Sequence, residues 1–195
     1  MGASSGGKRG ILVCAHGAGG HKDDPAMFRL AAALEPLLEV TRFNFPYREA
    51  GSKRIDPMPV LKAAFLKAIP NKRPLFIGGR SMGGRVASML AADGFECDGL
   101  LLAAYPLHPA GQPEKLRDAH LPNIRCPVLC LNGTRDALCR VDLMEKALAT
   151  VQAPWTMHWI EGADHSFNVL RSSGRTDAEV DLEIKSSVGS WLQSL

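Results

Sequence analysis

The sequence of 195 residues predicts an α/β fold, in which a six-stranded parallel sheet is covered by helices on both faces. Short apolar segments alternate with helix-like segments along the whole chain. Four of these segments, the first, third, fourth and fifth, are continuously apolar, as strands buried on both faces are. The second and sixth contain polar residues, which is typical of edge strands. With right-handed crossovers, these features favour the strand order 2-1-3-4-5-6.

Each predicted element has its own local signal. The strands are expected at residues 11–14, 40–45, 74–79, 99–104, 128–131 and 155–160. Helices are expected to begin at Asp24-Pro25 and Asp56-Pro57, because an acidic residue can cap a helix and proline fits its first position. Another helix follows residue 81, one spans about 141–149, and the last begins at the capping box Thr176–Glu179. Residues 1–10 are expected to be a flexible lead-in, and residues 11–195 a single domain.

Apolar residues define which side of each helix should be buried. Phe28 is assigned to the buried side of the first helix and Leu66 to that of the second. A Pro-rich connection, residues 106–127, joins the fourth and fifth strands. No insertion is large enough to form a separate cap over the sheet.

The composition is that of an ordinary globular protein, with 46% hydrophobic residues, 22% charged residues and a net charge of +3. Basic residues are scattered, so charge gives no support for nucleic-acid binding. No apolar run approaches a membrane span, and no signal peptide is recognisable, so a cytoplasmic location is expected. The five cysteines form no paired pattern. Cys126 and Cys130 are spaced CxxxC without a second pair, which favours neither zinc nor disulfides and fits a reducing compartment.

Two glycine-rich loops are expected to meet at one edge of the sheet. In this strand order, ligands bind beyond the carboxyl ends of strands one and three, where HGAGG and GGRSMGG lie. Gly79-Arg80-Ser81-Met82-Gly83 matches the nucleophile-elbow pattern G-x-S-x-G between a strand and a helix. We therefore expect Ser81 to be a nucleophile. The alternative is a structural turn whose serine only caps the next helix.

A nucleophilic serine needs a base, and the base needs an orienting acid. Asp136 follows the fifth strand in NGTRD, and His165 follows the sixth strand in GADHSF. The chain order Ser, Asp, His is one of those in which such triads occur. We expect His165 to be the base and Asp136 its orienting acid. Asp164 is expected to be a turn residue, Asp142 a helix cap and His16 a structural residue.

Acyl transfer also needs donors for the developing oxyanion. We expect these to be the backbone amides of Met82, which follows the nucleophile, and of Ala18 in HGAGG. Two phosphate-binding patterns match the sequence only in part. Residues 2–8 fit G-x-x-x-x-G-K, but Arg9 stands where serine or threonine is needed, and GAGGHK lacks the last glycine of a dinucleotide loop.

The segments HGAGG, FNFPY, GGRSMGG, NGTRD and EGADHSF together resemble the α/β-hydrolase superfamily. The chain is most similar to a small lidless branch near the dienelactone hydrolases, which includes the hydrolase-like subunit of the non-specific-lethal chromatin complex. The resemblance implies a three-layer α/β-hydrolase fold without a lid domain. It also implies Ser81 as nucleophile, Asp136 as acid, His165 as base, and Ala18 and Met82 as oxyanion donors.

The chain departs from the superfamily pattern in two respects. Dienelactone hydrolases carry a cysteine where this chain has Ser81, so their substrate does not transfer directly. The two leading strands that are usual in the superfamily have no room before the first predicted strand.

These observations predict a serine hydrolase that cleaves carboxylic esters or thioesters of small acyl groups through an acyl-enzyme. No metal or cofactor is implied. The expected partner is a small-molecule ester, in a monomer or homodimer, with neither nucleic acid nor membrane. The alternatives are a catalytically weak interaction module on the same scaffold and a flavodoxin-like nucleotide binder. Arg80 and Arg48 could favour acidic substrates if they faced the pocket, or could form structural ion pairs.

Overall fold

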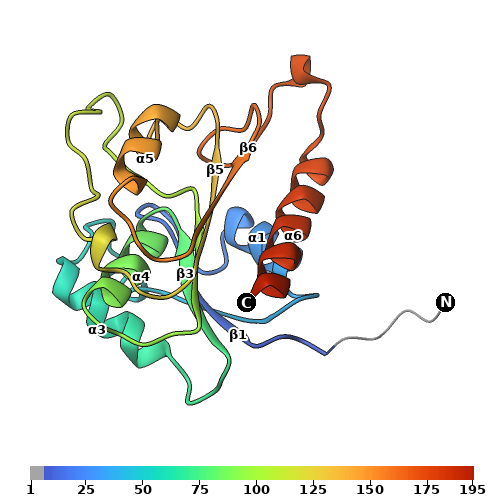
Figure 1. Cartoon of the computed structure of the whole chain (residues 1–195). Helices are drawn as coiled ribbons and strands as arrows, with labels where there is room; N and C mark the ends of the chain where they lie inside the picture. The colour runs from blue at the N-terminus through green and yellow to red at the C-terminus, as the bar shows by residue number, and fades with distance from the viewer. Residues whose placement is uncertain (1–6) are drawn as a thin grey trace.

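The computed structural model describes residues 7–195, which form one parallel sheet in the order β2-β1-β3-β4-β5-β6 (Figure 1). The predicted strand order is confirmed, with β2 and β6 at the two edges. The strands are β1 (Ile11–Ala15), β2 (Glu39–Phe43), β3 (Leu75–Arg80), β4 (Gly99–Ala103), β5 (Val128–Gly133) and β6 (Trp155–Ile160).

Helices cover both faces of the sheet. The α-helices are α1 (Pro25–Leu34), α2 (Pro46–Glu49), α3 (Met58–Ala68), α4 (Met82–Ala92), α5 (Val141–Leu148) and α6 (Asp177–Ser194), and the short 3₁₀ helices are η1 (Leu121–Asn123) and η2 (Arg171–Ser173). One hydrophobic cluster packs α1 and α6 against one face of the sheet. A second packs α3, α4 and α5 against the other face. This arrangement is the predicted three-layer fold.

The amino-terminal part of the sheet differs from the sequence prediction. Strand β2 ends at Phe43, and the chain then forms the short helix α2, which the sequence analysis missed. Phe28 in α1 was expected to be buried but is 50% exposed, and the guanidinium of Arg42 lies 4.0 Å from its ring centroid. Leu66 in α3 is also exposed. Both residues fit the helical periodicity, so apolar spacing alone overestimates the width of the buried face of each helix.

The start of α1 agrees with the sequence prediction, whereas α3 begins one residue later than predicted, at Met58 with Pro57 as its N-cap, and Asp56 accepts a hydrogen bond from the Tyr47 amide at 2.9 Å. Asp24 is the N-cap of α1, yet its carboxylate accepts a hydrogen bond from the His21 amide, at 2.6 Å, and none from the helix. Asp142 was expected to cap α5 but lies in its first turn, where it pairs with Arg140. The capping box that joins Thr176 and Glu179 at the start of α6 is confirmed.

The segment before β1 contacts the body of the fold. The Arg9 amide donates to the carbonyl of Leu37 at 2.9 Å, and its guanidinium donates to the carbonyl of Leu192 at 2.7 Å. Residues 1–6 of the expected lead-in lie outside the described residues. No helix within residues 7–195 combines the length and hydrophobicity needed to cross a membrane.

We predict that Gly78→Ala strongly destabilises the fold. A Cβ atom on Gly78, in the centre of β3, would lie 1.9 Å from the carbonyl oxygen of Leu101 in β4, so the two strands would have to separate. The expected loss in free energy of unfolding is about 3 kcal/mol or more. Chemical denaturation followed by circular dichroism measures it.

Gly189→Ala is the matched control for this prediction. A Cβ atom there would meet only Leu37 side-chain atoms at 3.9 Å, and alanine favours a helix over glycine by roughly 1 kcal/mol. The control is therefore expected to retain or gain stability. Equal stability of the two variants would contradict the close approach of β3 and β4.

Candidate active site

Ser81 lies at the sharp turn between β3 and α4. Its backbone has φ 53° and ψ −117°, a left-handed conformation that residues with a side chain rarely adopt. Its amide donates to the carbonyl of Ala103 at 2.8 Å, so the neighbouring strand holds the turn in place. The serine residue is largely buried. This is the strained strand–turn–helix geometry of a nucleophile elbow.

The end of β1 approaches the turn so closely that only glycine fits at the positions two residues before and after Ser81. A Cβ atom on Gly79 would lie 2.3 Å from the carbonyl oxygen of Ala15, and one on Gly83 would lie 2.2 Å from the same atom. Gly79 also has φ +150°, which disfavours other residues. The G-x-S-x-G spacing therefore reflects the close packing of the turn against β1.

The structure places the three predicted side chains in one hydrogen-bonded chain. Nε2 of His165 lies 3.0 Å from Oγ of Ser81, and Nδ1 of His165 lies 2.7 Å from Oδ2 of Asp136. The Asp136 side chain is fully buried, whereas the imidazole is partly exposed. Ser81, Asp136 and His165 follow β3, β5 and β6, so the carboxyl edge of the sheet brings them together from three loops.

Asn132 in β5 holds the buried carboxylate of Asp136. Nδ2 of Asn132 donates to Oδ2 of Asp136 at 3.3 Å, and the Leu138 amide donates to Oδ1 at 2.8 Å. Asn132 also exchanges hydrogen bonds with the backbone of Tyr105. The carboxylate is thereby oriented toward His165. The sequence analysis missed Asn132, although a buried asparagine that ends an apolar strand is itself a signal.

Arg80 holds the loop that carries His165. One guanidinium nitrogen of Arg80 donates to the carbonyl of His165 at 2.8 Å and to Oγ of Ser166 at 3.0 Å. Burial lowers the pKa of Arg80. Asp164 accepts hydrogen bonds from the amides of Ser166 and Asn168, as expected for a turn residue. Arg80 therefore stabilises the loop that carries His165 and does not line the cavity beside Ser81.

The HGAGG loop lies against the elbow, since a Cβ atom on Gly17 would be 3.3 Å from Cβ of Ser81. Nε2 of His16 accepts from the Phe45 amide at 3.2 Å, so Nδ1 carries the proton and donates to the carbonyl of Gly17 at 2.7 Å. Burial lowers the pKa of His16, which favours this neutral form. Because that carbonyl belongs to the peptide that bears the Ala18 amide, His16 orients a predicted oxyanion donor.

Tyr47 fixes the next peptide of the same loop. Its hydroxyl donates to the carbonyl of Ala18 at 2.6 Å, and its ring lies edge-on to His16. The sequence analysis missed this role of Tyr47, because nothing in the sequence brings FNFPY next to HGAGG. Two successive peptides at Ala18 are thus held by side chains, one from His16 at the start of the loop and one from Tyr47 in α2.

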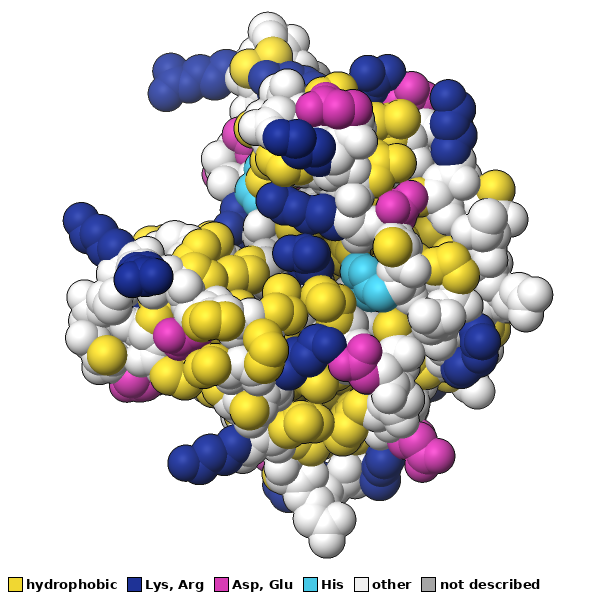
Figure 2. Space-filling view, turned by 90° about the vertical axis from the view of Figure 1, so that its left-hand side faces the viewer, with side chains coloured by type: hydrophobic (Ala, Val, Ile, Leu, Met, Phe, Trp, Pro, Cys, Tyr) yellow, Lys and Arg dark blue, Asp and Glu magenta, His cyan; other side chains and the backbone are white. Residues whose placement is uncertain are grey.

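A cavity of about 470 Å³ opens beside Ser81. Its charged lining residues are Arg85, Arg117 and Asp56, whereas Arg80 and Arg48 do not line it. Most of the wall is apolar, from Ala18, Ile55, Met58, Leu61, Met82, Pro106, Pro109, Ala110 and Leu138. Figure 2 shows the side of the molecule formed by α3, α4 and the connection after β4, where Lys and Arg side chains gather among hydrophobic ones.

The two arginines of the cavity have no acidic partner. Within residues 7–195, no carboxylate lies within 4.0 Å of a side-chain nitrogen of Arg85 or Arg117. Nε of Arg85 is buried and unbonded. Burial and the charge of Arg85 lower the pKa of Arg117. The sequence analysis missed both residues, because nothing in the sequence shows that residue 117 returns to the start of α4.

A second serine–histidine contact lies beneath this cavity. Oγ of Ser88 is 2.8 Å from Nε2 of His120, and the serine hydroxyl also donates to the carbonyl of Arg85 at 2.8 Å. Ser88 is fully buried and lies inside α4, in an ordinary helical backbone. No acid partner of His120 is found within residues 7–195. This pair anchors the connection after β4 to α4 and lacks the geometry of a reacting site.

The family model described as an alpha/beta hydrolase domain matches residues 8–193. The chain therefore belongs to the alpha/beta hydrolases, as its five motifs predict. No group of three or more His, Cys, Asp or Glu side chains within residues 7–195 could hold a metal ion.

Solved structures agree with this family. The chain is similar to Est1E from Butyrivibrio proteoclasticus, solved with bound ferulic acid, with TM-score 0.70, 14% identity, and coverage of 95% of this chain and 89% of that one. It is also similar to a dienelactone hydrolase from Anabaena variabilis, with TM-score 0.67, 20% identity, and coverage of 96% and 87%. A serine hydrolase without lid from Xanthomonas campestris gives TM-score 0.65, 21% identity, and coverage of 93% and 81%.

These likenesses confirm the predicted fold and its similarity to the lidless, dienelactone-hydrolase-like branch. The resemblance to the chromatin-complex subunit stays a prediction.

We predict that His120 makes the protein less stable in acid. Burial, with the nearby charges of Arg85 and Lys62, lowers the pKa of His120 from 6.5 to about 4. The unfolded chain therefore binds a proton at this residue between pH 6.5 and 4 that the folded chain does not, so stability falls as pH decreases through this window. The loss is about 1–2 kcal/mol, after a discount for partial exposure.

The measurement is Tm against pH for wild type and His120→Gln. Glutamine keeps an N–H group that can donate to Ser88 but does not titrate. The wild type is expected to lose about 4 °C more than the variant between pH 7 and pH 4. Parallel curves would contradict the buried, neutral state of His120.

Proposed function

We propose that this alpha/beta hydrolase cleaves carboxylic esters or thioesters of small acyl groups through an acyl-enzyme formed on Ser81. The observation that carries the proposal is the position of His165 between Ser81 and Asp136, at 3.0 Å and 2.7 Å, at the wall of a cavity. Similarity in fold to Est1E, which was solved with bound ferulic acid, and to an esterase domain of a Rhodothermus marinus protein supports it.

The proposed reaction begins when Oγ of Ser81 attacks the ester carbonyl. Nε2 of His165 takes the hydroxyl proton, and the buried Asp136 stabilises the resulting imidazolium. The same nitrogen returns the proton to the leaving alcohol or thiol, which leaves an acyl group on Ser81. Water then attacks this group with His165 as base, and the acid is released.

The developing oxyanion is assigned to the amides of Met82 and Ala18. Both residues line the cavity at Ser81, and Met82 is the first residue of α4, where an amide has no partner within the helix. The hydrogen bonds that His16 and Tyr47 make to the HGAGG loop support this assignment, because they fix the peptides on both sides of Ala18.

The cavity supports a more specific substrate class. Arg85 and Arg117 lie in its wall without a salt-bridge partner, and the carboxylate of Asp56 in the same wall accepts a hydrogen bond from the Tyr47 amide. An anionic group on the substrate could therefore pair with two guanidinium groups close to Ser81. The apolar remainder of the wall suits a short hydrocarbon chain. We therefore propose esters that carry a carboxylate a few carbon atoms from the reacting carbonyl.

We expect this enzyme to act in the cytoplasm. The five cysteines are free thiols in this structure, which supports a reducing compartment. The alternative function, an interaction module with little chemistry, would need none of the contacts among Ser81, Asp136 and His165.

We predict that a fluorophosphonate probe labels the native protein at Ser81. The adjacent imidazole activates the hydroxyl, and the fold alone brings the three side chains together, so heat-unfolded protein should not react. Ser81→Ala is expected to abolish labelling and esterase activity. His165→Ala should lower kcat by about 10⁶-fold, because the base is lost. Asp136→Asn should lower it by about 10⁴-fold, because the wrong imidazole tautomer is then favoured. Intact-mass and peptide mass spectrometry locate the label.

Ser88→Ala is the matched control for the labelling experiment. It removes a serine that also contacts a histidine, Ser88 with His120, and is expected to leave labelling unchanged. Labelling that persists in Ser81→Ala and disappears in Ser88→Ala would overturn the assignment. Native protein that stays unlabelled would favour the interaction module.

We predict that Arg85→Gln selectively impairs the hydrolysis of anionic esters. A charge-assisted hydrogen bond contributes about 1.5–3 kcal/mol, so kcat/KM for the 4-nitrophenyl monoester of glutaric acid should fall about tenfold or more. The 4-nitrophenyl ester of butyric acid, which has no carboxylate, should change less than about twofold. Arg140→Gln, which removes an exposed arginine paired with Asp142, is the control and should affect neither ester. Equal losses for both esters would contradict an anion-binding role.

A further inference from the structure

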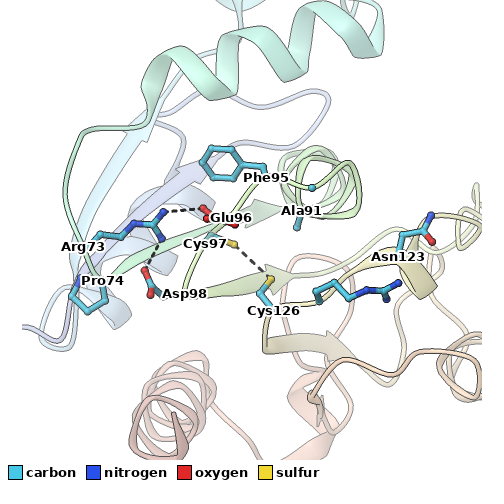
Figure 3. Close-up of a pocket in the computed structure, with 11 residues that line it drawn as sticks. Arg73, Pro74, Ala91, Phe95, Glu96, Cys97, Asp98, Asn123 and Cys126 are labelled. Atoms are coloured by element: carbon cyan, nitrogen blue, oxygen red, sulfur yellow. Dashed lines mark hydrogen bonds and ion pairs between the residues drawn. The ribbon is translucent and has the colours of Figure 1, made fainter.

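A cavity of about 730 Å³ lies at the amino ends of β4 and β5, the edge of the sheet opposite Ser81. Figure 3 shows that Cys97 and Cys126 point toward each other in its wall, with a hydrogen bond between their sulfur atoms. The proposed hydrolase chemistry uses neither residue.

We propose that Cys97 and Cys126 form a site of reversible oxidation, at which a hydroperoxide converts the two thiols into an intramolecular disulfide.

The distance between the two thiols is the first support. Their Sγ atoms are 3.6 Å apart, and a disulfide requires about 2.05 Å. Cys97 and Cys126 each precede one of two adjacent parallel strands, whose pairing begins at Leu100 and Val128. Small rotations of the two side chains can therefore close the remaining gap without moving the strands.

The segments that carry these thiols are held in place. Arg73 donates to the carboxylate of Asp98 at 2.9 Å and to the carbonyl of Glu96 at 3.1 Å, so both neighbours of Cys97 are fixed (Figure 3). Arg125 donates to the carbonyl of Pro122 at 2.7 Å, immediately before Cys126. The two sulfur atoms are thus presented to each other by a rigid frame.

Cys97 and Cys126 are more accessible to solvent than the other three cysteines. Cys97 and Cys126 are partly exposed and line an open cavity, whereas Cys14, Cys130 and Cys139 are each at most 1% exposed. Burial raises the pKa of all three buried thiols, to about 12 for Cys14 and Cys139. A peroxide in solution can therefore reach a reactive thiol only at the pair.

The hydrogen bond also gives the two thiols different pKa values and therefore different roles in the oxidation. Cys97 donates its proton toward Cys126, and this contact lowers the pKa of Cys126 and raises the pKa of Cys97. Cys126 is therefore the thiol that ionises first and attacks, and Cys97 is the resolving thiol.

The oxidation consumes one hydroperoxide. The Cys126 thiolate attacks a peroxide oxygen, so an S–O bond forms, the O–O bond breaks, and the second oxygen leaves as water or an alcohol after it takes a proton. The sulfur is oxidised by two electrons to a sulfenic acid, and the peroxide is reduced. Cys97 then loses its proton and attacks this sulfur. The S–S bond forms, the S–O bond breaks, and hydroxide leaves as water with that proton.

The disulfide would constrain the wall of the active-site cavity from a distance. The chain between Cys97 and Cys126 contains β4 and the connection that supplies Pro106, Pro109 and Arg117 to that cavity. A loop of about 30 residues would be closed, which is expected to raise Tm by roughly 5–10 °C.

The test treats the full-length native protein with one to two equivalents of hydrogen peroxide and then counts free thiols with a maleimide after unfolding. We expect two of the five thiols to be lost, a mass decrease of two hydrogen atoms, and a cross-linked peptide that contains Cys97 and Cys126. Dithiothreitol should restore both thiols and the original Tm. The readouts do not involve hydrolysis, so the result is independent of the proposed function.

Variants separate the pair from the remaining thiols. Cys97→Ala and Cys126→Ala should each abolish the cross-link, whereas the matched control Cys14→Ala should retain it. In Cys97→Ala, Cys126 loses the hydrogen bond that lowers its pKa and also its resolving thiol, so its sulfenic acid should form more slowly, persist and react with dimedone. A wild-type protein that forms only disulfide-linked dimers, only sulfinic acid, or no oxidised product under conditions that oxidise glutathione would overturn the proposal.

Discussion

The close approach of β1 to the turn after β3 is the constraint on which the site depends. The carbonyl oxygen of Ala15 lies so near this turn that neither Gly79 nor Gly83 could carry a side chain. This packing sets the left-handed backbone of Ser81 and starts α4 beside the HGAGG loop. The serine and the amides around it are therefore positioned by main-chain packing, before any side-chain contact is made.

Side chains then orient the carboxylate, the loops and the peptide groups around Ser81. Asn132 holds Asp136, Arg80 holds the loop of His165, and His16 holds the peptide next to Ala18. The contact of Arg80 joins segments that are 85 residues apart, whereas those of Asn132 and His16 are local, and each ends on a backbone carbonyl or a buried carboxylate. Their shared effect is to fix geometry in the folded state, so little reorganisation is needed when charge develops at the reacting carbonyl.

The sequence was sufficient for the fold class, the strand order and the place of Ser81, Asp136 and His165 relative to the strands. These depend on periodicity and on short motifs that local chemistry explains. It was insufficient for Tyr47, Asn132, Arg85 and Arg117, because their roles come from tertiary contacts alone. The sequence was also insufficient for Phe28, whose spacing in α1 predicts burial but whose exposed ring contacts the guanidinium of Arg42.

Helix α4 connects features that otherwise look separate. Ser81 caps its start, the Arg85 amide donates to the carbonyl of Ser81 one turn later, and the hydroxyl of Ser88 donates to the carbonyl of Arg85. Ser81 and the attachment point of the connection after β4 are thus held on one helix. The opposite wall belongs to a Pro-rich connection with few regular elements. Substitutions in that connection can therefore reshape the cavity beside Ser81, while α4 keeps the position of the serine.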